Sequence, residues 1–167
     1  IADGDWSSDV CSSDLAGLKA VTFAKISGIL SLADDSGLDI DALGGEPGYM
    51  SARYGGEGLD DQQRCLLVLR KMEGVPDSRR TARFICVMAL ASPQGSVEFC
   101  KGVCEGFITR SLKGSNHFGY DPIFFVPELG KTMAEVSPSL KNRYSHRGKA
   151  AAQAQKLLMK YLPAKNV

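Results

Sequence analysis

A long β-hairpin is predicted for residues 80–108, RTARFICVMALASPQGSVEFCKGVCEGFI. Side chains in the first half alternate between two faces, the period of a β-strand. One face would carry Ala82, Phe84, Cys86, Met88 and Leu90. The segment 93–96, Pro-Gln-Gly-Ser, predicts a turn into a second strand over 97–108. Gly102 and Gly106 in that strand indicate bulges or close approach of another backbone.

Helices and shorter strands are predicted on both sides of this hairpin. Before it, the pattern predicts a helix from Ala16 to a stop at Gly28, a strand over 29–33 and a helix over 60–72. After it come a strand over 123–126, a helix start at Pro138 and a last helix over 145–162. This order predicts an α/β fold, a mixed β-sheet with flanking helices in one domain.

The composition is that of an ordinary globular protein and excludes several classes. The 167 residues are 44% hydrophobic and 23% charged, with a net charge of +1. No basic face is indicated, so a nucleic-acid partner is not expected. No apolar run is long enough for a membrane span, and no secretory signal is recognisable. Five irregularly spaced cysteines predict reduced thiols and a cytoplasmic location.

Residues 1–15, IADGDWSSDVCSSDL, differ from the rest of the chain. They are polar, contain a short internal echo (SSDV, SSDL) and have no helical or strand period. We expect this segment to be foreign to the domain and disordered, and the domain to cover 16–167.

A first functional cluster is Asp34-Asp35-Ser36-Gly37, expected as a loop at the end of the strand over 29–33. Paired carboxylates at the end of a strand can hold a hard cation and orient a water molecule. Taken alone, the same four residues are better explained by an Asx-type turn.

Two further clusters follow the hairpin. Residues 118–122, Phe-Gly-Tyr-Asp-Pro, offer two flat aromatic faces around a glycine, although core aromatics anchoring a turn have the same pattern. Lys141, His146 and Arg147 place cations and a histidine around a helix start, which is typical of an anion or nucleobase site. A solvated helix face is the alternative. Together the three clusters supply the parts of a nucleotide hydrolase.

At these residues the sequence resembles the inosine/xanthosine triphosphate pyrophosphatases. The segment 32–56, LADDSGLDIDALGGEPGYMSARYGG, is similar to the first signature of that family. The segments 118–138, FGYDPIFFVPELGKTMAEVSP, and 141–150, KNRYSHRGKA, resemble its second and third. Order and spacing agree, and the resemblance runs from about residue 16 to residue 162.

The resemblance implies two lobes around a nucleotide-binding cleft, a Mg²⁺ cofactor and a homodimer. It implies hydrolysis of non-standard purine triphosphates (ITP, dITP, XTP) to the monophosphate and pyrophosphate, which cleanses the nucleotide pool. Asp35 matches the proton acceptor and metal ligand of the family. The positions that match its substrate contacts are Ser36, Phe118, Gly119, Tyr120, Asp121, Lys141, His146 and Arg147.

Chemistry is consistent with these roles. Attack at the α-phosphorus requires a carboxylate to orient water and a cation to neutralise charge. Phe118 would stack on the purine. Arg147 can donate to a 6-oxo group but cannot accept from a 6-amino group, which rationalises a preference for 6-oxo purines.

The sequence departs from the family at three places. The first strand of the family and its Thr/Ser-Gly-Asn-x-x-Lys phosphate loop have no match here, so we expect residues 16–167 to lack both. Asp14 stands where the family has a metal-binding Glu, and Asn116-His117 replaces a usual glycine pair.

Two alternatives therefore stay open: a catalytically impaired nucleotide-binding fragment, and a Maf-type nucleotide pyrophosphatase. The Ser-His-Arg segment after FGYDP favours the inosine/xanthosine family over the Maf type.

Overall fold

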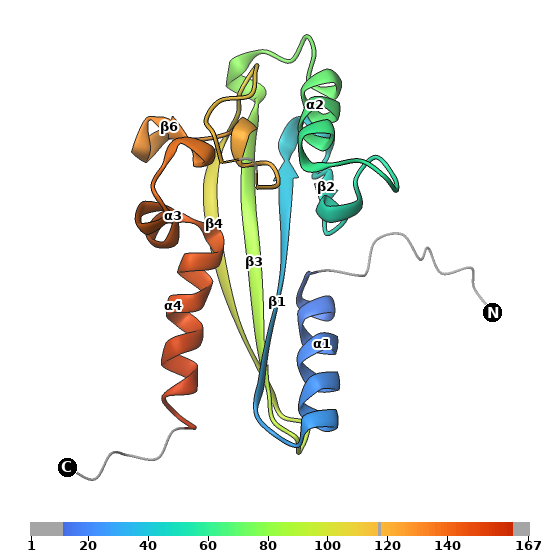
Figure 1. Cartoon of the computed structure of the whole chain (residues 1–167), viewed down its shortest axis with the longest axis vertical. Helices are drawn as coiled ribbons and strands as arrows, with labels where there is room; N and C mark the ends of the chain where they lie inside the picture. Colours follow the sequence, from blue (N-terminus) through green and yellow to red (C-terminus); the bar gives the residue numbers. More distant parts are fainter. Residues whose placement is uncertain (1–11, 117, 162–167) are drawn as a thin grey trace.

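The computed structural model describes residues 12–116 and 118–161, in which one long β-sheet is flanked by helices (Figure 1). The order of strands across the sheet is β2-β1-β3-β4-β5-β6. These strands are β1 (Ser31–Ile40), β2 (Pro47–Gly48), β3 (Thr81–Ala91), β4 (Val97–Ile108), β5 (Phe124–Val126) and β6 (Lys131–Thr132). The predicted α/β class is confirmed, and each described strand pairing is antiparallel.

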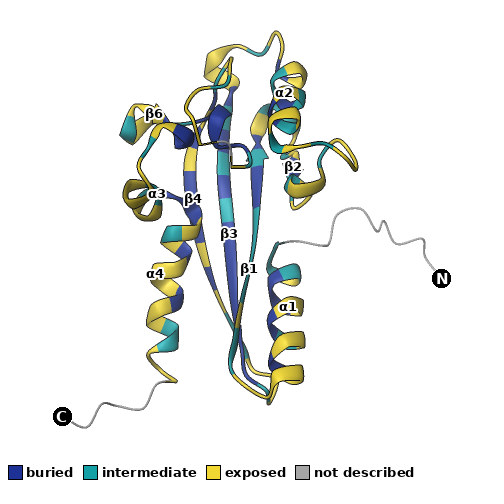
Figure 2. Cartoon of the chain, in the orientation of Figure 1, coloured by how far each residue is buried: buried dark blue, intermediate teal, exposed yellow. Residues whose placement is uncertain are grey.

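The described residues form four α-helices beside the sheet: α1 (Ser12–Ser27), α2 (Asp61–Lys71), α3 (Pro138–Tyr144) and α4 (His146–Leu158). Figure 1 shows α1 and α4 on either side of the long strands, with α2 and β2 at the other end of the molecule. Buried residues run along β3 and lie on the sides of α1 and α4 that face the strands (Figure 2). The predicted hairpin is confirmed, since β3 and β4 pair without a break from Thr81 opposite Phe107 to Ala91 opposite Val97.

The core at the α2 end is built from large apolar side chains. Leu38, Val68, Met72 and Phe124 are among its buried members. Helix α2, which contributes Val68 to this core, begins with a capping box. Asp60 Oδ1 accepts a hydrogen bond from the Gln63 N–H at 2.7 Å, and the Gln63 side chain accepts one from the Asp60 N–H. Such a box satisfies two backbone donors that a helix start otherwise leaves unpaired.

Helix α1 packs through small residues. Ala16, Ala20 and Ala24 are fully buried against β3, whereas Leu18 is 67% exposed. The helix approaches the sheet along this alanine stripe. The helix also begins at Ser12, four residues before the predicted start. The remainder of the unusual segment, residues 1–11, lies outside the described residues.

The first functional cluster is not a loop, which corrects the sequence prediction. Residues 34–37 lie inside β1, where they pair with residues 85–88 of β3. The polar side chains are tolerated because β1 is only half covered: β2 pairs only with its residues Leu38 and Asp39. In the described part of the chain, no strand lies beside the outer edge of residues 31–37.

Other sequence expectations concern cysteines and the last helix. The four described cysteines, Cys65, Cys86, Cys100 and Cys104, are free and buried, while Cys11 lies outside the described residues. Helix α4 ends at Leu158, and Leu162, the predicted end, is also outside. Within the described residues we find no helix with the length and apolarity needed to cross a membrane.

Gly102 allows α4 to lie directly against β4. A Cβ atom at this position would be 2.0 Å from the carbonyl oxygen of His146 and 2.5 Å from the amide nitrogen of Ala150. The predicted close approach of a backbone is thus confirmed here, and the continuous register of β4 shows that no bulge is involved. His146 is the first residue of α4. The close contact at Gly102 therefore also positions the backbone of His146 relative to β4.

We expect Gly102→Ala to lower the free energy of unfolding by about 1–3 kcal/mol, the usual cost of overpacking. The added methyl group meets backbone atoms, which cannot rotate away. Urea denaturation measures the change. Glu105→Ala, at an exposed position of the same strand, is the control and should cost less than about 0.5 kcal/mol. Equal losses in the two variants would contradict a packing role for Gly102.

Candidate active site

One cavity of about 740 Å³ brings together the eight residues expected to contact substrate. They come from three parts of the chain: β1, the turn that precedes β5, and the α3–α4 region. The cavity is lined by all of them: Ser36, Phe118, Gly119, Tyr120, Asp121, Lys141, His146 and Arg147. Segments more than 100 residues apart in sequence thus meet at one concave surface, as expected of a ligand site.

A cation and an aromatic ring meet at the cavity wall. Lys141 Nζ lies 4.9 Å from the centre of the Phe118 ring and forms an ion pair with Asp121. Phe118 is 60% exposed, so its ring is available for stacking. Asp121 is only 3% exposed. Burial raises the pKa of its carboxyl group, and the neighbouring Lys141 opposes that change.

The turn that carries Phe118 is held by hydrogen bonds to other elements. The Gly119 N–H donates to Asp61 Oδ2 at the start of α2 at 2.7 Å. The Tyr120 hydroxyl donates to the Ser51 carbonyl at 2.8 Å. Asn116 lines the cavity, whereas His117 is outside the described residues. These bonds fix the turn relative to α2.

His146 is a neutral, buried member of the cavity wall. Its ring stacks on Phe84 with centroids 4.6 Å apart and an interplanar angle of 12°. Burial, followed by the charges of Arg147 and Lys141, lowers its pKa to about 4. The Nδ1 atom is buried and has no hydrogen-bond partner among the described residues. A neutral imidazole with a free ring nitrogen can exchange a hydrogen bond with a polar ligand.

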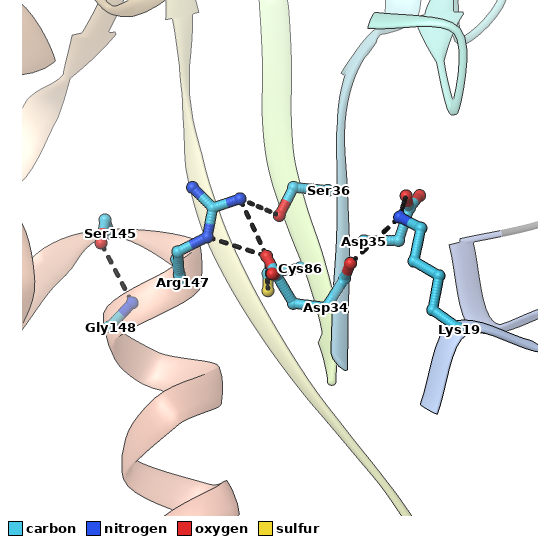
Figure 3. Close-up of polar contacts among 8 residues, drawn as sticks. All are labelled: Lys19, Asp34, Asp35, Ser36, Cys86, Ser145, Arg147 and Gly148. Atoms are coloured by element: carbon cyan, nitrogen blue, oxygen red, sulfur yellow. Dashed lines mark hydrogen bonds and ion pairs between the residues drawn. The ribbon is translucent and has the colours of Figure 1, made fainter. Parts of the chain in front are cut away.

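Arg147 extends from α4 to β1. Its Nε and Nη2 atoms donate to Asp34 Oδ2 at 2.9 and 2.8 Å, and Nη2 also donates to Ser36 Oγ at 3.3 Å (Figure 3). The side chains of Asp34 and Ser36 therefore point to the α4 side of the sheet.

Asp35 points to the opposite face, toward α1 (Figure 3). Its Oδ1 accepts from Lys19 Nζ at 2.8 Å, and its Oδ2 is buried without a partner among the described residues. The two aspartates therefore do not converge on one cation, which corrects the idea of a paired-carboxylate site. Asp35 is also absent from the lining of the large cavity. The described part of the chain holds no cluster of three His, Cys, Asp or Glu side chains suited to a metal ion.

Sequence reasoning missed several contributors to this region. Lys19 contacts Asp35, Asp61 holds the Gly119 turn, and Phe84 supports His146. Phe84 was assigned only to the buried face of a strand, and Asp61 only to a helix start. Their contacts lie 16 to 62 residues away in sequence and leave no local pattern.

A model of the Ham1 family matches residues 12–157. The chain belongs to the Ham1 family. Among its relatives is the dITP/XTP pyrophosphatase of Desulforamulus reducens, 51% identical over 140 residues, which are 84% of this chain and 70% of the relative. The dITP/XTP pyrophosphatase of Shouchella clausii is 56% identical over 135 residues, 81% of this chain and 68% of the relative.

Solved Ham1 structures share the fold. The Ham1 protein of Staphylococcus aureus is 39% identical, with a TM-score of 0.85 over 93% of this chain and 80% of that protein. A HAM1 protein from Coxiella burnetii is 43% identical, also with a TM-score of 0.85, over 92% of this chain and 79% of its own. The resemblance noted in the sequence and the predicted fold class are thus confirmed.

His146 should make stability depend on pH. Its pKa is about 4 in the folded protein and about 6.5 when exposed. Below pH 6.5 the unfolded chain takes up a proton that the folded protein resists, so the free energy of unfolding falls as the pH drops toward 4. The loss is at most about 3 kcal/mol. It is absent above pH 6.5, where both states are neutral at this residue.

Urea denaturation between pH 7.5 and 4 measures this loss. His146→Phe keeps a ring against Phe84 but cannot titrate, so its stability should decline less steeply than that of the wild type. Asp121, whose raised pKa acts in the opposite direction, is present in both proteins and cancels in the comparison. Identical pH slopes would show that folding does not lower the pKa of His146.

Proposed function

We propose that this protein hydrolyses non-standard purine nucleoside triphosphates, such as ITP, dITP and XTP, to the monophosphate and pyrophosphate. The observation that carries the proposal is the convergence of eight separately predicted contacts on one cavity. The names of the relatives, dITP/XTP pyrophosphatases, support the same substrate class.

In this proposal the purine occupies the large cavity. Phe118 stacks on the base, and stacking of this kind is worth about 1–3 kcal/mol. The guanidinium of Arg147 donates to the 6-oxo group, so a 6-amino group would leave that donor unpaired. The neutral His146 and the Lys141–Asp121 pair complete the polar contacts of the wall.

Asp35 is proposed as the residue that accepts a proton from the attacking water. Water attacks the α-phosphorus, the bond from this phosphorus to the bridging oxygen breaks, and pyrophosphate leaves with that oxygen. The buried and unpartnered Oδ2 of Asp35 fits a cation ligand as well. Mg²⁺ is bound through one or two carboxylates, waters and substrate phosphates, so a single protein carboxylate is an adequate donor set. When bound, Mg²⁺ would neutralise charge that develops on the phosphates.

The reaction is tested by incubating the protein with ITP and Mg²⁺ and identifying the products. We expect equal amounts of inosine monophosphate and pyrophosphate, and slower turnover of ATP. Release of single orthophosphates would contradict the proposed reaction. Binding of ITP without turnover would instead support a catalytically impaired nucleotide-binding protein.

Asp35→Asn is the control for this assay. The amide keeps the size of the side chain but removes its charge and its ability to take a proton, so turnover should fall at least about 100-fold. The fold should persist, because the pair with Lys19 is partly exposed and such pairs contribute little stability. Near-normal turnover at saturating Mg²⁺ would assign the role to another group.

A cytoplasmic location and a homodimer remain part of the proposal. The four free buried cysteines are compatible with a reducing compartment, and the dimer is carried over from the family resemblance. Membranes and nucleic acids are not proposed as partners.

We also propose that a preceding strand and a Thr-Gly-Asn-x-x-Lys loop would complete the domain assigned to residues 16–167. Among the described residues no strand covers the outer edge of residues 31–37 of β1, which supports this proposal. The exposed apolar side chains of Leu18, Phe23 and Ile26 on α1 support it as well. Covering an unpaired strand edge and an apolar surface with a further strand stabilises the fold.

Fusing such a segment ahead of Ala16 should raise the melting temperature and the rate of ITP hydrolysis relative to the 167-residue chain. The gain in rate is expected because the loop adds a lysine and backbone donors for the triphosphate. Calorimetry and the product assay, applied to both proteins, measure the two effects. Equal stability and equal turnover would show that the domain needs no such segment.

A further inference from the structure

Asp34 and Ser36 fix the orientation of the Arg147 guanidinium group. A single carboxylate oxygen, Oδ2, accepts from both Nε and Nη2, and Ser36 Oγ accepts a further bond from Nη2. Among the described residues, Nη1 has no hydrogen-bond partner, and Arg147 lines the cavity. Two of its nitrogens are thus fixed by the protein and the third is available to a ligand (Figure 3).

This contact also connects two elements that otherwise meet little. Helix α4 packs mainly on β3 and β4, whereas Asp34 and Ser36 belong to β1. The Arg147 side chain is 46% exposed, so packing alone does not determine its direction. Without Asp34, a long and flexible side chain at the start of α4 would sample many rotamers.

The charge of Asp34 matters as much as its position. An uncompensated arginine beside a nucleotide site is an excellent phosphate ligand. Here the carboxylate cancels the guanidinium charge, as Asp121 does for Lys141. A compensated guanidinium has less attraction for a polyanion and keeps its N–H donors, which suits a neutral carbonyl group.

We infer that Asp34 is a positioning residue for base recognition: it orients and neutralises Arg147 so that Nη1 donates to the 6-oxo group of a purine instead of to phosphate. The inference rests on the proposed function and deepens it. It gives the two adjacent aspartates different tasks, with Asp34 selecting the base on one face of β1 and Asp35 serving the reaction on the other.

A double-mutant cycle tests this inference. Asp34→Asn, Arg147→Leu and the double variant are compared with the wild type for kcat and KM with ITP and ATP at saturating Mg²⁺. Asp34→Asn should reduce the ITP-to-ATP ratio of kcat/KM by about 10-fold, the low end for a hydrogen bond to a charged group. The loss should lie mainly in a raised KM for ITP. In the Arg147→Leu background, Asp34→Asn should change the ratio less than twofold.

Inhibition by inorganic triphosphate supplies a second readout that a purely structural role would not change. Asp34→Asn leaves the charge of Arg147 uncompensated, so triphosphate should inhibit this variant more strongly than the wild type. The double variant lacks Arg147 and should not show this stronger inhibition. Asp41→Asn is the matched control, because it breaks another aspartate–arginine pair, with Arg83 at 2.7 Å, just after β1. Asp41→Asn should leave the ITP-to-ATP ratio of kcat/KM unchanged. Asp34→Glu should retain part of the ratio that Asp34→Asn loses.

Two results would overturn the inference. One is an unchanged base ratio in Asp34→Asn while Arg147→Leu alters it. The other is a full Asp34→Asn effect in the Arg147→Leu background, which would show that Asp34 does not act through Arg147. If the wild type does not hydrolyse ITP, the proposed reaction fails separately. Calorimetric binding of inosine and adenosine monophosphates to the same variants then tests Asp34, with a lost inosine preference in Asp34→Asn as the supporting result and an unchanged preference as the contrary one.

Discussion

The alternation of side chains along β1 is the constraint on which the candidate site depends. Successive residues of a strand point to opposite faces of the sheet, so Asp34 meets Arg147 of α4 while Asp35 meets Lys19 of α1. Two neighbouring carboxylates would repel each other if they shared one face. The strand separates them, and each receives its own cation.

Small residues make these long-range pairs geometrically feasible. Ala16, Ala20 and Ala24 bring α1 close to the sheet, and Gly102 allows the backbone of α4 to touch β4. Helix α4 is fixed further by Lys149, which donates to the Val103 carbonyl at the edge of β4. Larger side chains at these contacts would lift the helices, and with them Lys19 and Arg147, away from their carboxylates.

These features explain which parts of the molecule could be predicted from sequence. The hairpin over 80–108 and the helix that Asp60 caps follow from local periods and end signals, and both are present. The segment 34–37 was assigned to a loop because Asp, Ser and Gly are turn formers. Its true conformation depends on pairing with β3 and on cations from α1 and α4, which a local pattern does not contain.

The same distinction applies to the site. The three clusters contain nine of the 19 residues that line the cavity, because each cluster is short and chemically distinctive. Their supports could not be found in this way. Asp61 and Ser51 form hydrogen bonds with Gly119 and Tyr120 from 58 and 69 residues away in sequence. These bonds hold the turn in place, and no local sequence pattern predicts them.

Charge compensation gives the arrangement its chemical logic. Lys141 is paired with Asp121 and Arg147 with Asp34, and the depressed pKa of His146 keeps that ring neutral. A wall of aromatic surface and compensated donors suits an uncharged base better than a polyanion. On the proposed function, the phosphates would lie on the side of β1 where the unpartnered Asp35 Oδ2 could hold the Mg²⁺ that binds them. Base selection and phosphate chemistry would thus occupy opposite faces of one strand, and the spacing of its side chains would fix their relative position.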